Sequence, residues 1–190
     1  MTAFSGNWFQ RRTARRKAAG EAYRRLLRQA LEPSWYLESA VSDTFDGRAR
    51  MITLLTSLAI DRLSRIAGPD IAPLAARLDE LVLDGFDAAF REKGVGDASI
   101  ARKVRKLAQE HAGLGKALFA ALKDDSKTQR AAQVDAVLRR NGVVAPGHAG
   151  ALATTLLDLQ AHLAAQPDEE ILHGRFDWMA AGAGQGTLQH

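Results

Sequence analysis

Five histidines are the side chains of this protein best suited to acid–base or metal chemistry near neutral pH. No two of them are four residues apart, so none forms the paired-ligand pattern of a zinc site on a helix. The chain also contains no Cys, which excludes thiolate-bound zinc, iron–sulfur clusters and a Cys nucleophile. The sequence therefore predicts no metal site and no cofactor; the histidines are His111, His148, His162, His173 and His190.

Carboxylates form the second group with chemical potential. Glu80, Asp84 and Asp87 share one face of an expected helix, with Asp79 beside them, and such a cluster could serve acid–base catalysis. No His lies near them in sequence, so a solvated or salt-bridged face is favoured. His111 falls in an apolar helical stripe and is expected to be a core-edge imidazole bonded to a neighbour. The sequence thus predicts a protein that is not an enzyme and has no small-molecule substrate.

Basic residues are concentrated near the start of the chain. Eight Arg or Lys against one Glu give residues 11–28 a net charge of +7, whereas the whole chain carries +4. Trp8 and Phe9 precede this block, and aromatic rings beside positive charge suit a membrane interface or base stacking. A solvated helix face is the simpler alternative. The predicted contacts to an anionic membrane surface or the ribosome are Arg11, Arg12, Arg15, Arg16, Lys17, Arg24, Arg25 and Arg28.

The overall composition is that of one globular domain. The chain has 190 residues, 46% of them hydrophobic and 25% charged, which is enough to build a core without disulfides or a structural metal. It has no run of 18 apolar residues that could span a bilayer, and Arg replaces the apolar centre of a secretory signal. A mitochondrial transit peptide is a less favoured reading of the same segment. The expected organisation is a flexible N-terminus (1–12), a helical domain (13–175) and a Gly-rich tail (176–190).

The elements that position these residues are expected to be helices. Ala and Leu recur at helical spacing and no segment alternates with period two, which predicts an all-α, single compact domain of about six to seven helices. The segment 48–67 is apolar on more than one side, as in a central helix packed by several neighbours. The expected helices cover about 13–31, 34–41, 48–67, 70–91, 97–122, 129–140 and 147–166.

Two turn motifs carry a family resemblance. The turn DTFDGR precedes the apolar central segment, and the string REKGVGD separates an acidic-aromatic segment from a basic helix. In this order and at this distance they closely resemble the ubiquinol-cytochrome c chaperone family, over roughly residues 20–142. The residues that carry the resemblance are Asp43, Asp46, Gly47, Arg48, Phe86, Asp87, Arg91, Glu92, Gly94, Val95, Gly96, Asp97, Lys103 and Lys106.

The resemblance implies a function. Members of the family are all-helical, non-enzymatic chaperones that hold newly made cytochrome b before its assembly into ubiquinol-cytochrome c reductase, respiratory complex III. It implies a peripheral location at the inner face of the inner membrane, either in a bacterial cytoplasm or on the matrix side of a mitochondrion. The short segment before the first expected helix favours a bacterial member, which could act without the small partner subunit of mitochondrial members.

A nascent transmembrane segment exposes apolar helix surface, which a groove of aliphatic and aromatic side chains can cover. The predicted client-binding residues are Met51, Leu54, Leu55, Leu58, Phe86 and Phe90, although a place in the core is favoured for any single one of them. Arg48, Arg91, Glu92 and Asp97 are expected to join the two turns by charge-assisted hydrogen bonds. The alternative function is a ribosome- or nucleic-acid-associated basic helical protein that acts through residues 11–28.

Overall fold

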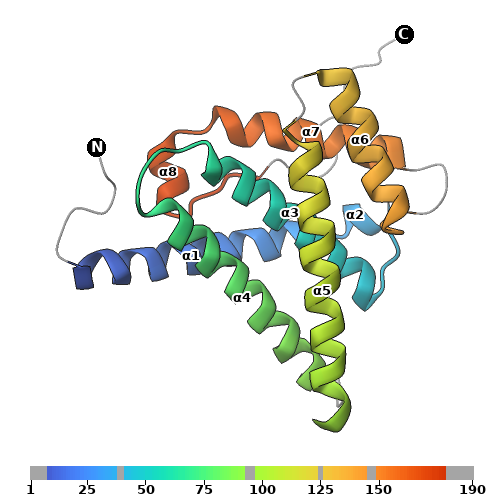
Figure 1. Cartoon of the computed structure of the whole chain (residues 1–190), viewed down its shortest axis with the longest axis horizontal. Coiled ribbons are helices and arrows are strands. Elements are labelled where there is room, and N and C mark those ends of the chain that lie inside the picture. Colours follow the sequence, from blue (N-terminus) through green and yellow to red (C-terminus); the bar gives the residue numbers. More distant parts are fainter. Residues whose placement is uncertain (1–7, 38–40, 93–96, 124–125, 145–148, 179–190) are drawn as a thin grey trace.

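The computed structural model describes residues 8–37, 41–92, 97–123, 126–144 and 149–178. Within these ranges every regular element is a helix, which confirms the all-α prediction of a single compact domain (Figure 1). Six of the helices have fourteen residues or more, and two are short. The helices are α1 (Trp8–Ala30), α2 (Ser34–Leu37), α3 (Phe45–Ser64), α4 (Ile71–Glu92), α5 (Asp97–Ala121), α6 (Lys127–Arg140), α7 (Ala149–Ala165) and α8 (Asp168–Leu172).

The helices differ from the expected ranges mainly at their ends. α1 begins at Trp8 rather than at residue 13, because Gln and Arg are good helix formers and allow the helix to continue toward the N-terminus. α3 begins at Phe45 because the Thr44 side chain caps it, accepting a hydrogen bond from the Gly47 amide. α8 lies beyond the last expected helix, which ended at about residue 166. Its first three residues are acidic, and negative charge stabilises a helix N-terminus.

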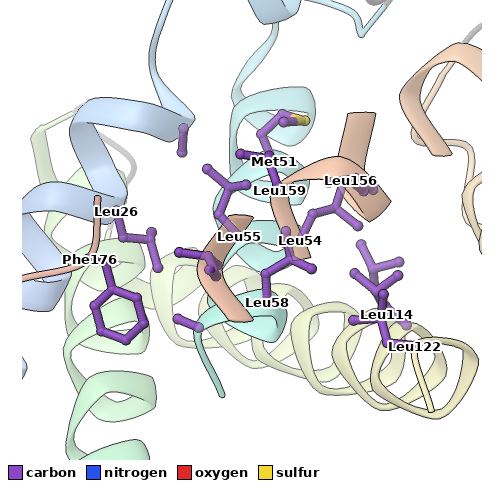
Figure 2. Packing of buried hydrophobic residues seen from close by; sticks show 14 of the residues in the cluster. Leu26, Met51, Leu54, Leu55, Leu58, Leu114, Leu122, Leu156, Leu159 and Phe176 are labelled. Atoms are coloured by element: carbon purple, nitrogen blue, oxygen red, sulfur yellow. The ribbon is translucent and has the colours of Figure 1, made fainter. Parts of the chain in front are cut away.

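α3 is the central helix, as its apolar sequence predicted. It packs against α1, α4, α5 and α7, while α6 lies on α5 and α7. Met51, Leu54, Leu55 and Leu58 are completely buried or nearly so. Figure 2 shows them gathered with Leu26 of α1, with Leu156 and Leu159 of α7, with Leu114 of α5 and with Leu122 just after the end of α5. A helix surrounded in this way must be apolar on several sides, since each side faces a different neighbour.

The end of the described chain also belongs to this core. Phe176 is 1% exposed, and its ring stacks on that of Trp178 with centroids 6.0 Å apart. The packed region therefore extends past residue 175, where the helical domain was expected to end, because these aromatic side chains fill space beside α1 and α7. Residues 179–190 of the expected Gly-rich tail lie outside the described residues.

Polar side chains fix the C-terminal end of α3. The guanidinium of Arg62, which is 5% exposed, donates hydrogen bonds to the carbonyls of Leu163 (2.7 Å) and Gln166 (2.6 Å). These carbonyls lie at the end of α7, where they have no partner within the helix. The buried carboxylate of Asp61 accepts from Gln160 of α7 (2.9 Å) and from Arg65 (2.7 Å). The end of α3 is thus bound to α7 by hydrogen bonds as well as by packing.

A smaller apolar cluster lies where α4 and α5 approach each other at their adjoining ends (Figure 1). Ala49 of α3, Val82, Phe86 and Phe90 of α4, and Ile100 and Leu107 of α5 form its buried part. Phe45, at the start of α3, packs against it, and its ring centroid lies 4.6 Å from that of Phe90. Phe45 belongs to the first motif turn and Phe90 directly precedes Arg91 of the second, so the cluster connects the described parts of the two motif regions.

Candidate functional site

A groove of about 340 Å³ lies between the C-terminal half of α1, the first half of α3 and the C-terminal half of α4. Arg48 and Glu92 are the charged residues among those that line it, and most of the others are apolar. Its lining consists of Tyr23, Leu27, Leu31, Phe45, Arg48, Ala49, Ile52, Val82, Gly85, Phe86, Ala89 and Glu92. An open groove with apolar walls and charge at its edge can bind an apolar side of another helix.

Gly85 sets how closely α1 approaches α4 at this groove. The Tyr23 side chain of α1 lies against Gly85, and a Cβ at position 85 would collide with the Tyr23 hydroxyl. Burial of that hydroxyl raises the pKa of Tyr23, with a further contribution from the negative charge of Asp84. The groove therefore keeps its shape because α4 lacks a side chain where the Tyr23 ring crosses it.

The first motif turn holds Arg48 at the mouth of the groove. The Asp43 carboxylate accepts hydrogen bonds from Arg48 Nε (2.6 Å) and Nη2 (3.2 Å), and these bonds lower the pKa of Asp43. The Arg48 guanidinium also lies over the Tyr36 ring, 5.5 Å from its centroid. The Tyr36 hydroxyl donates to the Ala30 carbonyl (2.6 Å), and burial raises its pKa to about 12. Arg48 is thus positioned from two sides while about half of its side chain stays exposed.

Gly47 has a structural role in the same turn. Its amide donates to the Thr44 hydroxyl, and a Cβ there would collide with the Ser42 carbonyl. Asp46 is exposed in the first turn of α3, where a negative charge suits the helix dipole. It lines a second cavity, of about 310 Å³, together with Phe90 and Lys103.

The second motif turn is described only in part. Arg91 donates to Asp87 in its own helix (2.7 Å), and Glu92 is exposed at the groove. Gly94, Val95 and Gly96 lie outside the described residues, and Asp97 begins α5. The described bonds of Arg48 and Arg91 stay within their own segments. The Phe45–Phe90 ring pair, which no sequence pattern indicated, joins the described parts of the two motif regions, and the predicted polar link between the turns stays a prediction.

The six predicted client-binding residues are core residues in this structure. Met51, Leu54, Leu55 and Leu58 are at most 1% exposed, so contact with a client would require the helices around α3 to separate. Phe86 and Phe90 are 4% and 9% exposed, and only Phe86 lines the groove between α1, α3 and α4. The accessible apolar walls come instead from neighbours such as Leu27, Leu31 and Ile52. A sequence signal could have indicated such residues: Leu31 is apolar but falls outside the buried stripe of the helix that precedes it.

His111 occupies the place predicted for it, at the edge of the core. Its Nδ1 lies 2.8 Å from the Thr53 hydroxyl and its Nε2 lies 2.9 Å from the Asp79 carboxylate. Both ring nitrogens are therefore engaged in joining α3, α4 and α5. Across the described residues, no group of three His, Asp or Glu side chains is placed to hold a metal ion. The helices described here also include none that is long and apolar enough to cross a membrane.

The predicted basic contacts divide into paired and unpaired residues. Arg24 and Arg25 both bind Glu21 at 2.6 Å, and the bonds to Arg25 and Arg24 lower the pKa of Glu21. Arg15 reaches Asp70 at 3.4 Å. Within the described part of the chain, the remaining five have no carboxylate partner: Arg11, Arg12, Arg16, Lys17 and Arg28.

Comparisons with known proteins place this arrangement in a family. The model of the ubiquinol-cytochrome C chaperone family matches residues 37–178, which include both motif turns and two of the three helices of the groove. The crystal structure of the Cbp3 homolog from Brucella abortus has a TM-score of 0.75 to this chain at 27% sequence identity, covering 91% of this chain and 95% of that chain. No curated protein matches the sequence. The protein belongs to the ubiquinol-cytochrome c chaperone family.

Proposed function

We propose that this protein is an assembly chaperone of respiratory complex III that covers an apolar helical segment of newly made cytochrome b in the groove between α1, α3 and α4. The observation that carries the proposal is the position of the family motifs. Arg48 of the first motif and Glu92 of the second stand at the edge of one apolar groove, and Phe86 forms part of its wall. Family membership supplies the kind of client.

The groove suits a few side chains of a helix rather than a whole helix. Its volume of about 340 Å³ can take apolar anchors that recur at helical spacing, while the rest of the client helix lies along the outside. Leu31 is 40% exposed at the edge and extends the apolar surface toward solvent. Covering such a segment removes apolar area from water and lowers its tendency to aggregate.

Arg48 can fix the end of the bound segment. Asp43 and Tyr36 hold its guanidinium in place, and its exposed half leaves donors that can reach a helix C-terminal carbonyl or a carboxylate of the client. No catalytic residue or small-molecule substrate is part of this proposal, because His111 and the acidic residues of α4 serve contacts within the fold. The place of work is the inner face of the inner membrane, where cytochrome b is inserted.

The test adds charge to leucines that line the groove and, as a control, to a leucine outside it. Leu27→Glu with Leu31→Glu places carboxylates in the groove, whereas Leu37→Glu alters a leucine that is 82% exposed and does not line it. Each tagged variant is expressed in the native host, and retained cytochrome b is measured after a high-salt wash. The groove pair is expected to lose cytochrome b while Leu37→Glu keeps it. Equal retention by the folded groove pair would contradict the proposal.

A further inference from the structure

The N-terminal part of α1 projects beyond the body of the protein. In Figure 1 the dark blue end of α1, at the left, extends past the other helices. The first buried residue of α1 is Ala18, and none of residues 8–17 is buried. We call residues 8–17 the α1 tip. Ala14 packs against the core and Arg15 pairs with Asp70, but packing does not explain the aromatic rings and the other basic side chains of the tip.

Two aromatic rings stand at the end of the tip. Trp8 is 54% exposed and Phe9 is 70% exposed, and their centroids lie 4.7 Å apart in an edge-to-face arrangement. The Arg12 guanidinium lies over the Trp8 ring at 5.5 Å. Large apolar rings gathered at one exposed end of a helix mark a surface that another phase or partner covers.

The charge of the tip is equally unexplained by the fold. It has five basic residues and no acidic one. Only Arg15 has a described carboxylate partner, Asp70, and that bond helps to hold the base of the tip against the start of α4. Basic residues near a helix N-terminus oppose the helix dipole, so they do not stabilise α1 itself. Farther along α1, by contrast, Arg24 and Arg25 both form ion pairs with Glu21.

We propose that the α1 tip docks this protein on the surface of an anionic lipid bilayer. Trp8 and Phe9 enter the boundary between headgroups and acyl chains, and Arg11, Arg16 and Lys17 bind lipid phosphates. A helix end that combines exposed aromatic rings with unpaired basic residues has the two features that interfacial segments use. Nucleic acid is the less suitable partner, because base stacking needs an open ring face and Arg12 covers one face of Trp8.

The docking surface is independent of the client groove. The tip comprises residues 8–17, whereas the groove is lined by Tyr23 and Leu27 of α1 and by Leu31 just after it. Loss of lipid binding would therefore leave binding of purified client unchanged, and loss of the groove would leave lipid binding unchanged. The two proposals can fail separately.

The experiment measures co-sedimentation of the full chain with vesicles. Vesicles of phosphatidylcholine alone are compared with vesicles that also contain phosphatidylglycerol, at low and at physiological salt. The wild type is expected to bind the anionic vesicles and to weaken as salt screens the charges. Arg11→Gln with Arg16→Gln should lower partitioning by about fivefold per charge removed. The matched control, Arg102→Gln with Arg105→Gln, removes two exposed charges from α5 and should bind like the wild type.

The aromatic contribution has its own readout. Brominated lipids quench Trp fluorescence at the acyl boundary. Trp35 is buried at 1% exposure, and the half-buried Trp178 is replaced by Phe in every protein of this comparison. Quenching should therefore be lost in Trp8→Phe, although this variant still sediments with anionic vesicles. Trp8→Ala with Phe9→Ala should lower sedimentation. The proposal is overturned if the wild type ignores anionic vesicles, if the tip variants bind them as the wild type does, or if the tip binds structured RNA and not vesicles.

Discussion

The two ends of α3 each present an arginine, and they use it differently. At the C-terminal end Arg62 is buried, and its donors bind the carbonyls that end α7. At the N-terminal end Arg48 is half exposed, held by Asp43 and by the Tyr36 ring beside an open groove. The donors of Arg62 are used in bonds within the fold, whereas Arg48 is held in position with part of its side chain accessible. A functional surface is therefore expected at the end where positioned donors remain accessible, and that is the end that carries the family motif.

The largest effect is expected on stability, at the C-terminal end of α3 where Arg62 is buried. Arg62→Ala removes the buried guanidinium that donates to the carbonyls of Leu163 and Gln166, so it should lower the free energy of unfolding by about 3 kcal/mol. Urea denaturation measures this value. Arg77→Ala, which breaks an ion pair with a Glu80 side chain that is 61% exposed, serves as the control and should cost much less. An Arg62→Ala protein as stable as the wild type would remove the basis of the comparison.

A smaller loss is expected where α1 crosses α4. Gly85→Ala places a Cβ against the Tyr23 hydroxyl and should lower the free energy of unfolding by about 1–3 kcal/mol. The same urea experiment tests it. Because the hydroxyl makes the closest contact, Tyr23→Phe in the same chain should restore part of the stability. Failure of the second substitution to restore any stability would show that the ring does not fix the groove.

Arg48→Ala, at the N-terminal end of α3 beside the groove, should change function without changing stability. Its partner Asp43 is exposed, so loss of the pair should leave the free energy of unfolding nearly unchanged. Retention of cytochrome b should fall severalfold, because the positioned donor at the groove is gone. A pull-down and a urea curve on the same preparation measure both quantities. A large loss of stability with unchanged retention would reverse the assignment of the two ends.

The smallest effect is the pH response of the same turn. The bond to Arg48 holds the pKa of Asp43 below that of the unfolded chain. Its contribution to stability is therefore complete above the ordinary pKa of a carboxyl, and it is lost as the pH falls through the lowered folded-state value. The Asp43 carboxyl carbon shift, followed by NMR against pH, should titrate below the ordinary range and return to it in Arg48→Ala. An identical titration in both proteins would contradict the described hydrogen bonds.

Much of the fold was predictable because it depends on local patterns. Helical spacing of Ala and Leu predicted the long helices, and a segment that is apolar on more than one side predicted the central place of α3. The position of His111 in an apolar stripe predicted its core-edge role, which its bonds to Thr53 and Asp79 confirm. These features are set by residues within one or two helical turns of each other.

The site was harder to predict because it depends on contacts distant in sequence. When a helix is apolar on several sides, the sequence does not show which side faces solvent rather than another helix. Met51 and Leu54 could therefore not be distinguished from Ile52 as groove residues. The Phe45–Phe90 ring pair, the crossing of Tyr23 over Gly85 and the Arg15–Asp70 bond all join different helices. Such contacts are set by how helices pack, and a single sequence carries no direct sign of them.

Site-specific photo-crosslinking during synthesis of cytochrome b tests whether the client binds in the groove between α1, α3 and α4. A photoreactive amino acid is placed at Leu31 or Ile52 in the groove, and at Leu37 or Arg140 outside it. If cytochrome b binds in the groove, we expect crosslinks to newly made cytochrome b from the two groove positions and not from the other two. Crosslinks from Arg140 on α6, with none from the groove, would show that cytochrome b binds a different face and would contradict the account.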